Sequence, residues 1–144
     1  VEGVFNLGGD LELFRRCILE QDREELERYA LACIDVLYEY MVHFSVDVTT
    51  ISLVQGDALG GGFETALGAH VIIAEKGVKM GFPEALFNLF PGMGAFSILS
   101  RKMGAHAAEE MMLSGKLHEA EELYEMGLVN ILAEPGDGEN EVYR

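Results

Sequence analysis

The chain has 144 residues, 49% of them hydrophobic, so it is long enough for one domain with a buried core and too apolar to remain disordered. Its formal charge of −15, from 10 Lys and Arg against 25 Asp and Glu, argues against nucleic acid or an anionic membrane surface as the main partner, because both need a basic face. The sequence has no apolar run of about 18 residues, which predicts no membrane-spanning helix.

The chain begins with a predicted strand end and a helix. Residues 4–7 predict the end of a strand, and residues 8–10 turn the chain into a helix whose apolar face runs from residue 11 to residue 18. Cys17 and Cys33 fall inside predicted helices without the spacing of a metal site. They predict buried free thiols in a reducing cytoplasm, which is where we expect the protein.

A long helix and a strand follow. Asp22 and Glu25 resemble a capping box with Asp22 as the N-cap, and apolar residues then recur at spacings of three and four as far as residue 41. The β-branched segment 48–54 predicts a buried strand. A glycine loop comes next and leads into a helical segment at residues 64–70.

Strands and helices alternate in the rest of the chain, which places it in the α/β class. The predicted strands are residues 71–74, 78–82 and 128–132, and the predicted helices are residues 95–102, 105–113 and 118–126. Pro83 ends the second of these strands, and residues 90–94 form a loop.

Two glycine loops, at residues 8–9 and 60–62, each follow an apolar strand and precede a helix. Glycine allows positive φ and lets a ligand approach the backbone, and a helix N-terminus adds unpaired N–H groups. Together the loops could offer paired N–H donors to one oxygen, which is an oxyanion hole. A plain tight turn is the alternative for either loop alone, and neither matches the phosphate-loop pattern.

Glu64 and Glu84 stand apart from the other acidic residues, most of which lie on predicted solvated helix faces. Glu64 comes soon after the second glycine loop, and Glu84 follows Gly-Phe-Pro at a strand end among apolar neighbours. A carboxyl group in apolar surroundings has a raised pKa and can exchange protons near neutrality. Two such groups facing one substrate can divide acid and base roles. The four histidines have no ligand spacing, so we expect no metal site.

These motifs resemble a known family. FNLGGDL at residues 5–11 resembles the first oxyanion motif of the crotonase (enoyl-CoA hydratase/isomerase) superfamily, and ALGGGFE at residues 58–64 resembles its second. The likeness continues through residues 69–95 and 113–130, so it covers nearly the whole chain. Leu7 replaces the usual Ala of the first motif, and with the helical insert after it this looks most like the diffusible-signal-factor synthase branch. Enzymes of that branch make cis-2-unsaturated fatty acid signals.

The resemblance implies a crotonase-like spiral of ββα units. We expect residues 1–144 to form one partial domain, a fragment without the N-terminal strands and C-terminal helices of the family. The family's catalytic glutamates fall on Glu64 and Glu84. Its oxyanion hole falls on Gly61 and on the pair Gly8 and Gly9, between which sequence alone gives only a slight preference for Gly9. No cofactor is implied.

The implied activity is that of an acyl-thioester lyase with thioesterase action. It would dehydrate 3-hydroxyacyl chains on acyl carrier protein to cis-2-enoyl thioesters and release the free unsaturated acid. The alternatives are an enoyl-CoA hydratase or isomerase acting on CoA thioesters and a non-catalytic binding module of the same fold. Implied partners are further copies, as a homotrimer when full length, and a sensor kinase's receiver domain. An acidic carrier protein needs a basic landing patch, for which the candidates are Arg15, Arg16, Arg101, Lys102 and Lys116.

Overall fold

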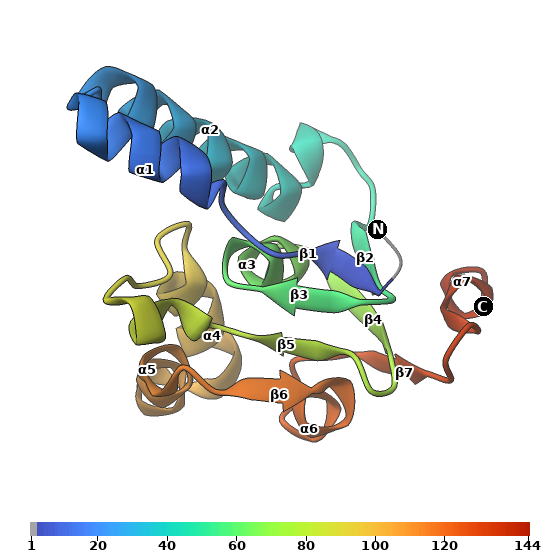
Figure 1. The fold of residues 1–144 in the computed structure, drawn as a ribbon. Helices are drawn as coiled ribbons and strands as arrows, with labels where there is room; N and C mark the ends of the chain where they lie inside the picture. The colour runs from blue at the N-terminus through green and yellow to red at the C-terminus, as the bar shows by residue number, and fades with distance from the viewer. Residues whose placement is uncertain (1–2) are drawn as a thin grey trace.

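The computed structural model describes residues 3–144, which form an α/β fold on two sheets (Figure 1). The strand order is β1-β3-β5-β6 in one sheet and β2-β4-β7 in the other. The strands are β1 (Val4–Asn6), β2 (Ile51–Val54), β3 (Asp57–Leu59), β4 (Val71–Glu75), β5 (Lys79–Gly81), β6 (Leu117–Glu119) and β7 (Ile131–Ala133). The helices are α1 (Leu11–Glu20), α2 (Arg23–Met41), α3 (Gly61–Leu67), α4 (Ala95–Met103), α5 (Ala105–Ser114), α6 (Ala120–Glu125) and α7 (Gly138–Val142), with short 3₁₀ helices η1 (His43–Ser45) and η2 (Pro83–Phe87).

The chain alternates between the two sheets in ββα units. The pair β2 and β3 is followed by α3, and the pair β4 and β5 by η2, α4 and α5, with the first strand of each pair in one sheet and the second in the other. All strand pairs are parallel except β5 with β6. This confirms the α/β class predicted from the sequence.

A single apolar core lies between the sheets and helices. Phe63 of α3 and Phe82, just after β5, are both fully buried, and their ring centroids lie 5.0 Å apart. Met80, Leu99 and Leu123 join the same cluster from β5, α4 and α6. The helices on either side of the sheets therefore share one core, and α3 runs through its centre.

The helices α1 and α2 form a hairpin that projects above the sheets (Figure 1). Asp10 caps α1 by accepting hydrogen bonds from the N–H groups of Glu12 and Leu13, so a helix follows residues 8–10 as predicted.

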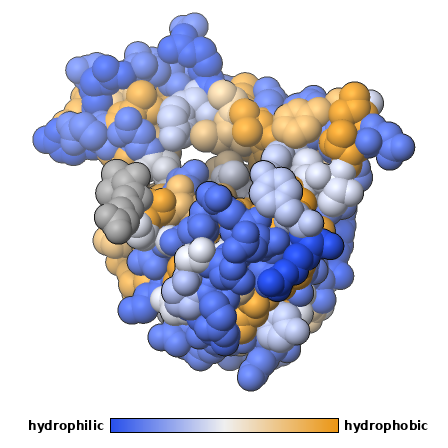
Figure 2. Space-filling model, turned by 90° about the vertical axis from the view of Figure 1, so that its right-hand side faces the viewer, coloured by the Kyte–Doolittle hydropathy of each residue, from blue (hydrophilic) through white to orange (hydrophobic). Residues whose placement is uncertain are grey.

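On α2 only Leu37 is buried, although the periodicity predicted a whole apolar face. Apolar atoms gather along the upper part of the molecule, while the body below is mainly hydrophilic (Figure 2). The exposed apolar side chains of α2 and η1 include Leu31, Ile34, Val36, Tyr38 and Phe44.

Two predictions about α1 and α2 differ from the structure. Asp22 caps α2 by accepting the Glu25 N–H, but the Glu25 carboxylate pairs with Arg16 at 2.7 Å, away from the cap. The predicted capping box is therefore only half formed. Cys17 is buried as predicted, whereas Cys33 is only half-buried because the face of α2 that carries it is partly open.

Two strands differ from their predicted places. The predicted strand 48–54 begins only at Ile51, and the predicted strand 128–132 is shifted to Ile131–Ala133. The short strand β3 was not predicted, because its three residues lie against the glycine loop and look like part of it. The helix predicted at residues 64–70 begins earlier, at Gly61, and ends at Leu67.

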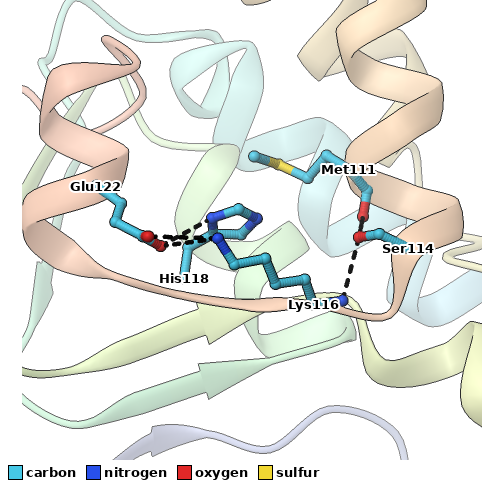
Figure 3. A network of polar contacts seen from close by, with 5 residues as sticks. All are labelled: Met111, Ser114, Lys116, His118 and Glu122. Carbon is cyan, nitrogen blue, oxygen red and sulfur yellow. Dashed lines mark hydrogen bonds and ion pairs between the residues drawn. The ribbon is translucent and has the colours of Figure 1, made fainter.

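The predicted helix at residues 118–126 is wrong in its first part. His118 lies in β6, where it pairs with Met80 of β5, and the helix α6 begins at Ala120. Nδ1 of His118 lies 3.0 Å from the carboxylate of Glu122, which also binds Lys116. This network ties β6 to α6 (Figure 3).

None of the helices in the described part of the chain combines the length and apolarity needed to cross a bilayer.

Candidate active site

Three loops meet at one edge of the first sheet. Strands β1, β3 and β5 are parallel neighbours, so their carboxyl ends lie at the same edge (Figure 1). The loops that leave these ends carry the two glycine motifs and Glu84. Residues that are far apart in the sequence are thereby brought to one place.

The two glycine loops are in direct contact. A Cβ atom on Gly61 would lie 3.6 Å from Cα of Gly8 and 3.8 Å from the backbone nitrogen of Gly9. A Cβ on Gly8 would lie 3.2 Å from the nitrogen of Gly61, and Gly8 has φ +95°, a conformation that favours glycine. A side chain at Gly8 would crowd the second loop, whereas one at Gly61 would make ordinary van der Waals contact with the first loop.

The backbone N–H groups of the first loop are not equivalent. The N–H of Gly8 donates to Oδ1 of Asn6 at 2.8 Å. The N–H groups of Leu7 and Gly9, and that of Gly61 in the second loop, have no acceptor among residues 3–144. Gly8 is therefore the least suited of these to bind a ligand oxygen, and Leu7 is a further candidate that was not predicted from the sequence.

Glu64 lies on the first turn of α3 with 1% of its surface exposed. Its Oε1 accepts two backbone N–H groups, from Met93 at 2.8 Å and from Ala95 at 2.9 Å. Burial raises the pKa of the carboxyl group, the two N–H donors act in the opposite direction, and the negative charge of Glu84 raises it further. The carboxylate is thus held firmly and still favours protonation more than an exposed glutamate does.

Glu84 lies in η2, directly after Pro83. Its Oε1 packs against Gly60, and its Oε2 is buried with no hydrogen-bond partner in the described part of the chain. Burial raises the pKa of this carboxyl group as well. A buried, unpartnered carboxylate oxygen is costly in a folded protein and marks a group available to a ligand.

Met93 joins the parts of the site. Its N–H binds Glu64, and its sulfur lies 3.1 Å from the position that a Cβ on Gly61 would occupy. The loop before α4 therefore contacts both Glu64 and the second glycine loop. The sequence singled out Glu64, Glu84 and the glycines, and the structure brings them together, but the role of residues 93–95 gave no signal because it depends on backbone groups.

The remaining polar clusters lie elsewhere. His70 contacts Thr50 and packs edge-on against His43, and His118 belongs to the network of β6 and α6. Within residues 3–144 no three His, Cys, Asp or Glu side chains come together in a way that would hold a metal ion. At the site itself, two carboxyl groups lie beside backbone N–H groups that have no acceptor among the described residues.

The chain is similar to known proteins over nearly its whole length. The family model for enoyl-CoA hydratase/isomerase matches residues 1–136. Probable enoyl-CoA hydratase 2, mitochondrial, of Arabidopsis thaliana is 32% identical over 139 residues, which are 95% of this chain and 43% of that protein.

Solved structures are similar as well. An enoyl-CoA hydratase from Polaromonas sp. JS666 has a TM-score of 0.89 and 25% identity, over 99% of this chain and 54% of that one. Pseudomonas aeruginosa DspI has a TM-score of 0.86 and 26% identity, over 99% and 56%. The chain therefore spans about half the length of the proteins that it matches.

Proposed function

The chain belongs to the enoyl-CoA hydratase/isomerase family and has the crotonase fold, and from that premise we propose that it acts on acyl-CoA thioesters as an enoyl-CoA hydratase or isomerase. The observation that carries the proposal is the convergence of Glu64, Glu84 and the two glycine loops at one edge of the first sheet. The same convergence explains why both carboxyl groups are withdrawn from water.

The free N–H groups would bind the thioester carbonyl oxygen. We assign one donor to Gly61 and the other to Leu7 or Gly9, since the N–H of Gly8 is used by Asn6. Donors fixed in advance stabilise the negative charge that develops on this oxygen when the carbon beside it gains or loses a proton. They act more strongly on the enolate than on the ground-state carbonyl, as catalysis requires.

The two glutamates would move the protons. In hydration the oxygen of water bonds to C3 of the enoyl chain, one ionised carboxyl group takes a proton from that water, and the other, protonated carboxyl group gives its proton to C2. In isomerisation a proton leaves one carbon and another returns at a different carbon. Raised pKa values suit Glu64 and Glu84 to both directions of transfer near neutral pH.

The distribution of positive charge gives little support to an acyl carrier protein as the partner of this part of the chain. Of the five cations that would form a landing patch for an acidic carrier, Arg15, Arg16 and Lys116 are held in ion pairs with acidic neighbours. Ion pairs cancel the field that would attract the carrier. Only Arg101 and Lys102, near the end of α4, have no ion pair within the described residues.

A second candidate keeps the same site. The motif FNLGGDL, through its resemblance to the diffusible-signal-factor synthase branch, supports dehydration of a 3-hydroxyacyl thioester followed by hydrolysis to the free acid. The pair of N–H donors would then also stabilise the tetrahedral oxyanion of hydrolysis. The enoyl-CoA hydratases among the similar proteins favour the first candidate.

The test is an assay of the purified protein with crotonyl-CoA and, separately, with a 3-hydroxyacyl-carrier protein. We expect loss of the enoyl absorbance of crotonyl-CoA, and a decrease of about 10²- to 10⁴-fold in Glu64→Gln and in Glu84→Gln, because each removes a proton-transfer group. Release of free unsaturated acid from the carrier protein alone would support the second candidate. Turnover that survives both substitutions, or no turnover of either thioester, would refute the catalytic proposal.

A further inference from the structure

We propose that Asn6 is a positioning residue that holds the first glycine loop in the conformation needed to bind the substrate oxygen. The inference rests on the proposed function, since it concerns the same pair of N–H donors. Asn6 is the last residue of β1 and pairs with Ala58 of β3. It therefore lies at the point where the first loop leaves the sheet.

The side chain of Asn6 controls the direction of the first loop. Its Oδ1 accepts the N–H of Gly8, two residues later, at 2.8 Å. This is an Asx turn, in which the side chain replaces a backbone acceptor. Since Gly8 and Gly9 are the most flexible pair of residues that a chain can contain, the loop has little stiffness of its own.

The main chain of Asn6 is fixed by the second glycine loop. A Cβ atom on Gly62 would lie 2.0 Å from the carbonyl oxygen of Asn6 and 2.9 Å from its Cβ. Gly62 is buried in the first turn of α3, so Asn6 packs directly against the helix that carries Glu64. Asn6 is thus held from one side by α3 and holds the first loop from the other.

The hydrogen bond to Asn6 determines which N–H groups of the first glycine loop can bind a substrate oxygen. The N–H of Gly8 is engaged by Asn6, whereas those of Leu7 and Gly9 have no acceptor among residues 3–144. Without the Asn6 side chain, the N–H of Gly8 has no fixed acceptor and the loop samples several conformations. The transition state then has to order the loop, which lowers the rate more than it lowers substrate binding.

Three variants test the proposal. We expect Asn6→Ala to lower kcat for crotonyl-CoA by about 10- to 100-fold with little change in KM, because a donor displaced by about 1 Å loses most of its effect. Asn6→Ser should recover most of the rate, since a Ser hydroxyl can accept the same N–H in an equivalent turn. Gln55→Ala is the matched control, as it removes a side-chain amide that binds Glu75 away from the site.

Two further measurements separate positioning from general destabilisation. Cinnamoyl-CoA absorbs at longer wavelength when its carbonyl is polarised by hydrogen bonds, so its red shift on binding should fall in Asn6→Ala and return in Asn6→Ser. Amide exchange at Gly8, followed by NMR, should be faster in Asn6→Ala than in the wild-type protein. This readout does not depend on turnover.

The outcomes are distinct. If Asn6→Ala keeps the wild-type kcat, red shift and Gly8 exchange, the inference is wrong while the proposed function stands. If Asn6→Ala does not fold, Asn6→Ser decides: loss of the red shift in a folded Asn6→Ser protein also overturns the inference. If the wild-type protein neither turns over crotonyl-CoA nor shifts the absorption of cinnamoyl-CoA, the proposed function fails first and the role of Asn6 fails with it.

Discussion

The carboxylate of Glu84 lies against the backbone of Gly60, so closely that a Cβ atom there would approach its Oε1 to 2.5 Å. Gly60 is also the N-cap of α3, and its carbonyl oxygen accepts the N–H of Glu64 at 3.0 Å. One glycine therefore sets the position of both carboxyl-bearing residues. This contact makes the glycine a requirement of the site as well as of the turn.

Gly60→Ala should lower activity more than it lowers stability. The added methyl group must push the Glu84 carboxylate aside, and we expect a loss of kcat of about 100-fold, measured with crotonyl-CoA. Gly77→Ala is the control, because Gly77 also has positive φ, at +81°, but has no atom within 4 Å of its Cβ position. Gly77→Ala should lose about 1–2 kcal/mol of unfolding free energy from backbone strain, and Gly60→Ala should lose more, because Gly60 has φ +57° and ψ −124°, outside the left-handed helical region. Equal activities in the two variants would contradict the role given to the contact.

The buried glutamates should make stability fall as the pH rises. Both carboxyl groups have pKa values raised above the ordinary glutamate value of 4.5, so between that value and the folded pKa the native state holds protons that the unfolded state has lost. Stability is therefore greatest below this window and decreases through it. Replacing both with Gln should give a protein whose unfolding free energy at pH 7 exceeds that of the wild type.

Urea unfolding at several pH values from 4 to 8 measures this effect. The advantage of the double Gln variant should shrink toward the acid end, where the wild-type glutamates are protonated in both states. Glu109→Gln, on an exposed position of α5, should follow the wild-type profile. A double variant that is less stable than the wild type at pH 7 would show that the ionised carboxylates stabilise the fold.

Leu37 should anchor the α1–α2 hairpin to the core. It is the buried residue of α2, and its Cδ1 lies 2.4 Å from the position that a Cβ on Gly68 would occupy. We expect Leu37→Ala to cost about 2–5 kcal/mol of unfolding free energy, because it leaves a cavity between α2 and α3. Leu31→Ala, at a side chain 53% exposed, should change it by less than about 0.5 kcal/mol. If thermal or urea unfolding showed similar losses of unfolding free energy in Leu37→Ala and Leu31→Ala, the hairpin would be held by other contacts.

Glu75 should hold α7 against the second sheet at neutral pH. Its Oε1 accepts the side-chain N–H of Gln55 at 2.9 Å and the backbone N–H of Gly138 at 3.1 Å. Burial raises the pKa of this carboxyl group, but the hydrogen bonds outweigh it and the pKa is lowered overall, so its stabilising effect is present above the ordinary pKa and is lost as the pH falls.

Glu75→Ala should lower the unfolding free energy by about 1–3 kcal/mol, because two donors lose their acceptor. The protection of the Gly138 amide relative to its intrinsic exchange rate should fall, as it also should in the wild-type protein on acidification. Glu139→Ala, at an exposed position of the same helix, is the control. Unchanged exchange at Gly138 in Glu75→Ala would contradict the proposed anchoring.

The parts of the fold that depend on local pattern could be predicted from the sequence. The periodic helices α2, α4 and α5 and the apolar strand β4 follow the predicted spans closely. The strands β3 and β6 were not predicted, because the residues of β3 look like part of the glycine loop and those of β6 were included in a predicted loop and helix. The residues around His118 have a pattern typical of a helix, but His118 pairs with Met80 and lies in a strand.

The same division applies to the site. Glu64 and Glu84 drew attention through neighbouring Gly and Pro residues, which are local signals. The groups that hold Glu64 are backbone N–H groups 29 and 31 residues later, and backbone groups look alike in every sequence. The hydrogen bond from Gly8 to Asn6 is local, but the role proposed for Asn6 also depends on its packing against α3, which is a contact between residues far apart in the sequence.

The pairing of β4 with β7 has a consequence for how the chain is made. Ile72 N–H, in β4, donates to the side chain of Asn130, 58 residues further along the chain. At about 5–20 residues per second, a ribosome needs roughly 3–12 seconds to synthesise that interval. During this time one edge of an apolar strand has no partner and can pair with another nascent chain. The yield of folded protein should therefore fall as more chains are synthesised side by side, and a lower number of simultaneous nascent chains should restore it.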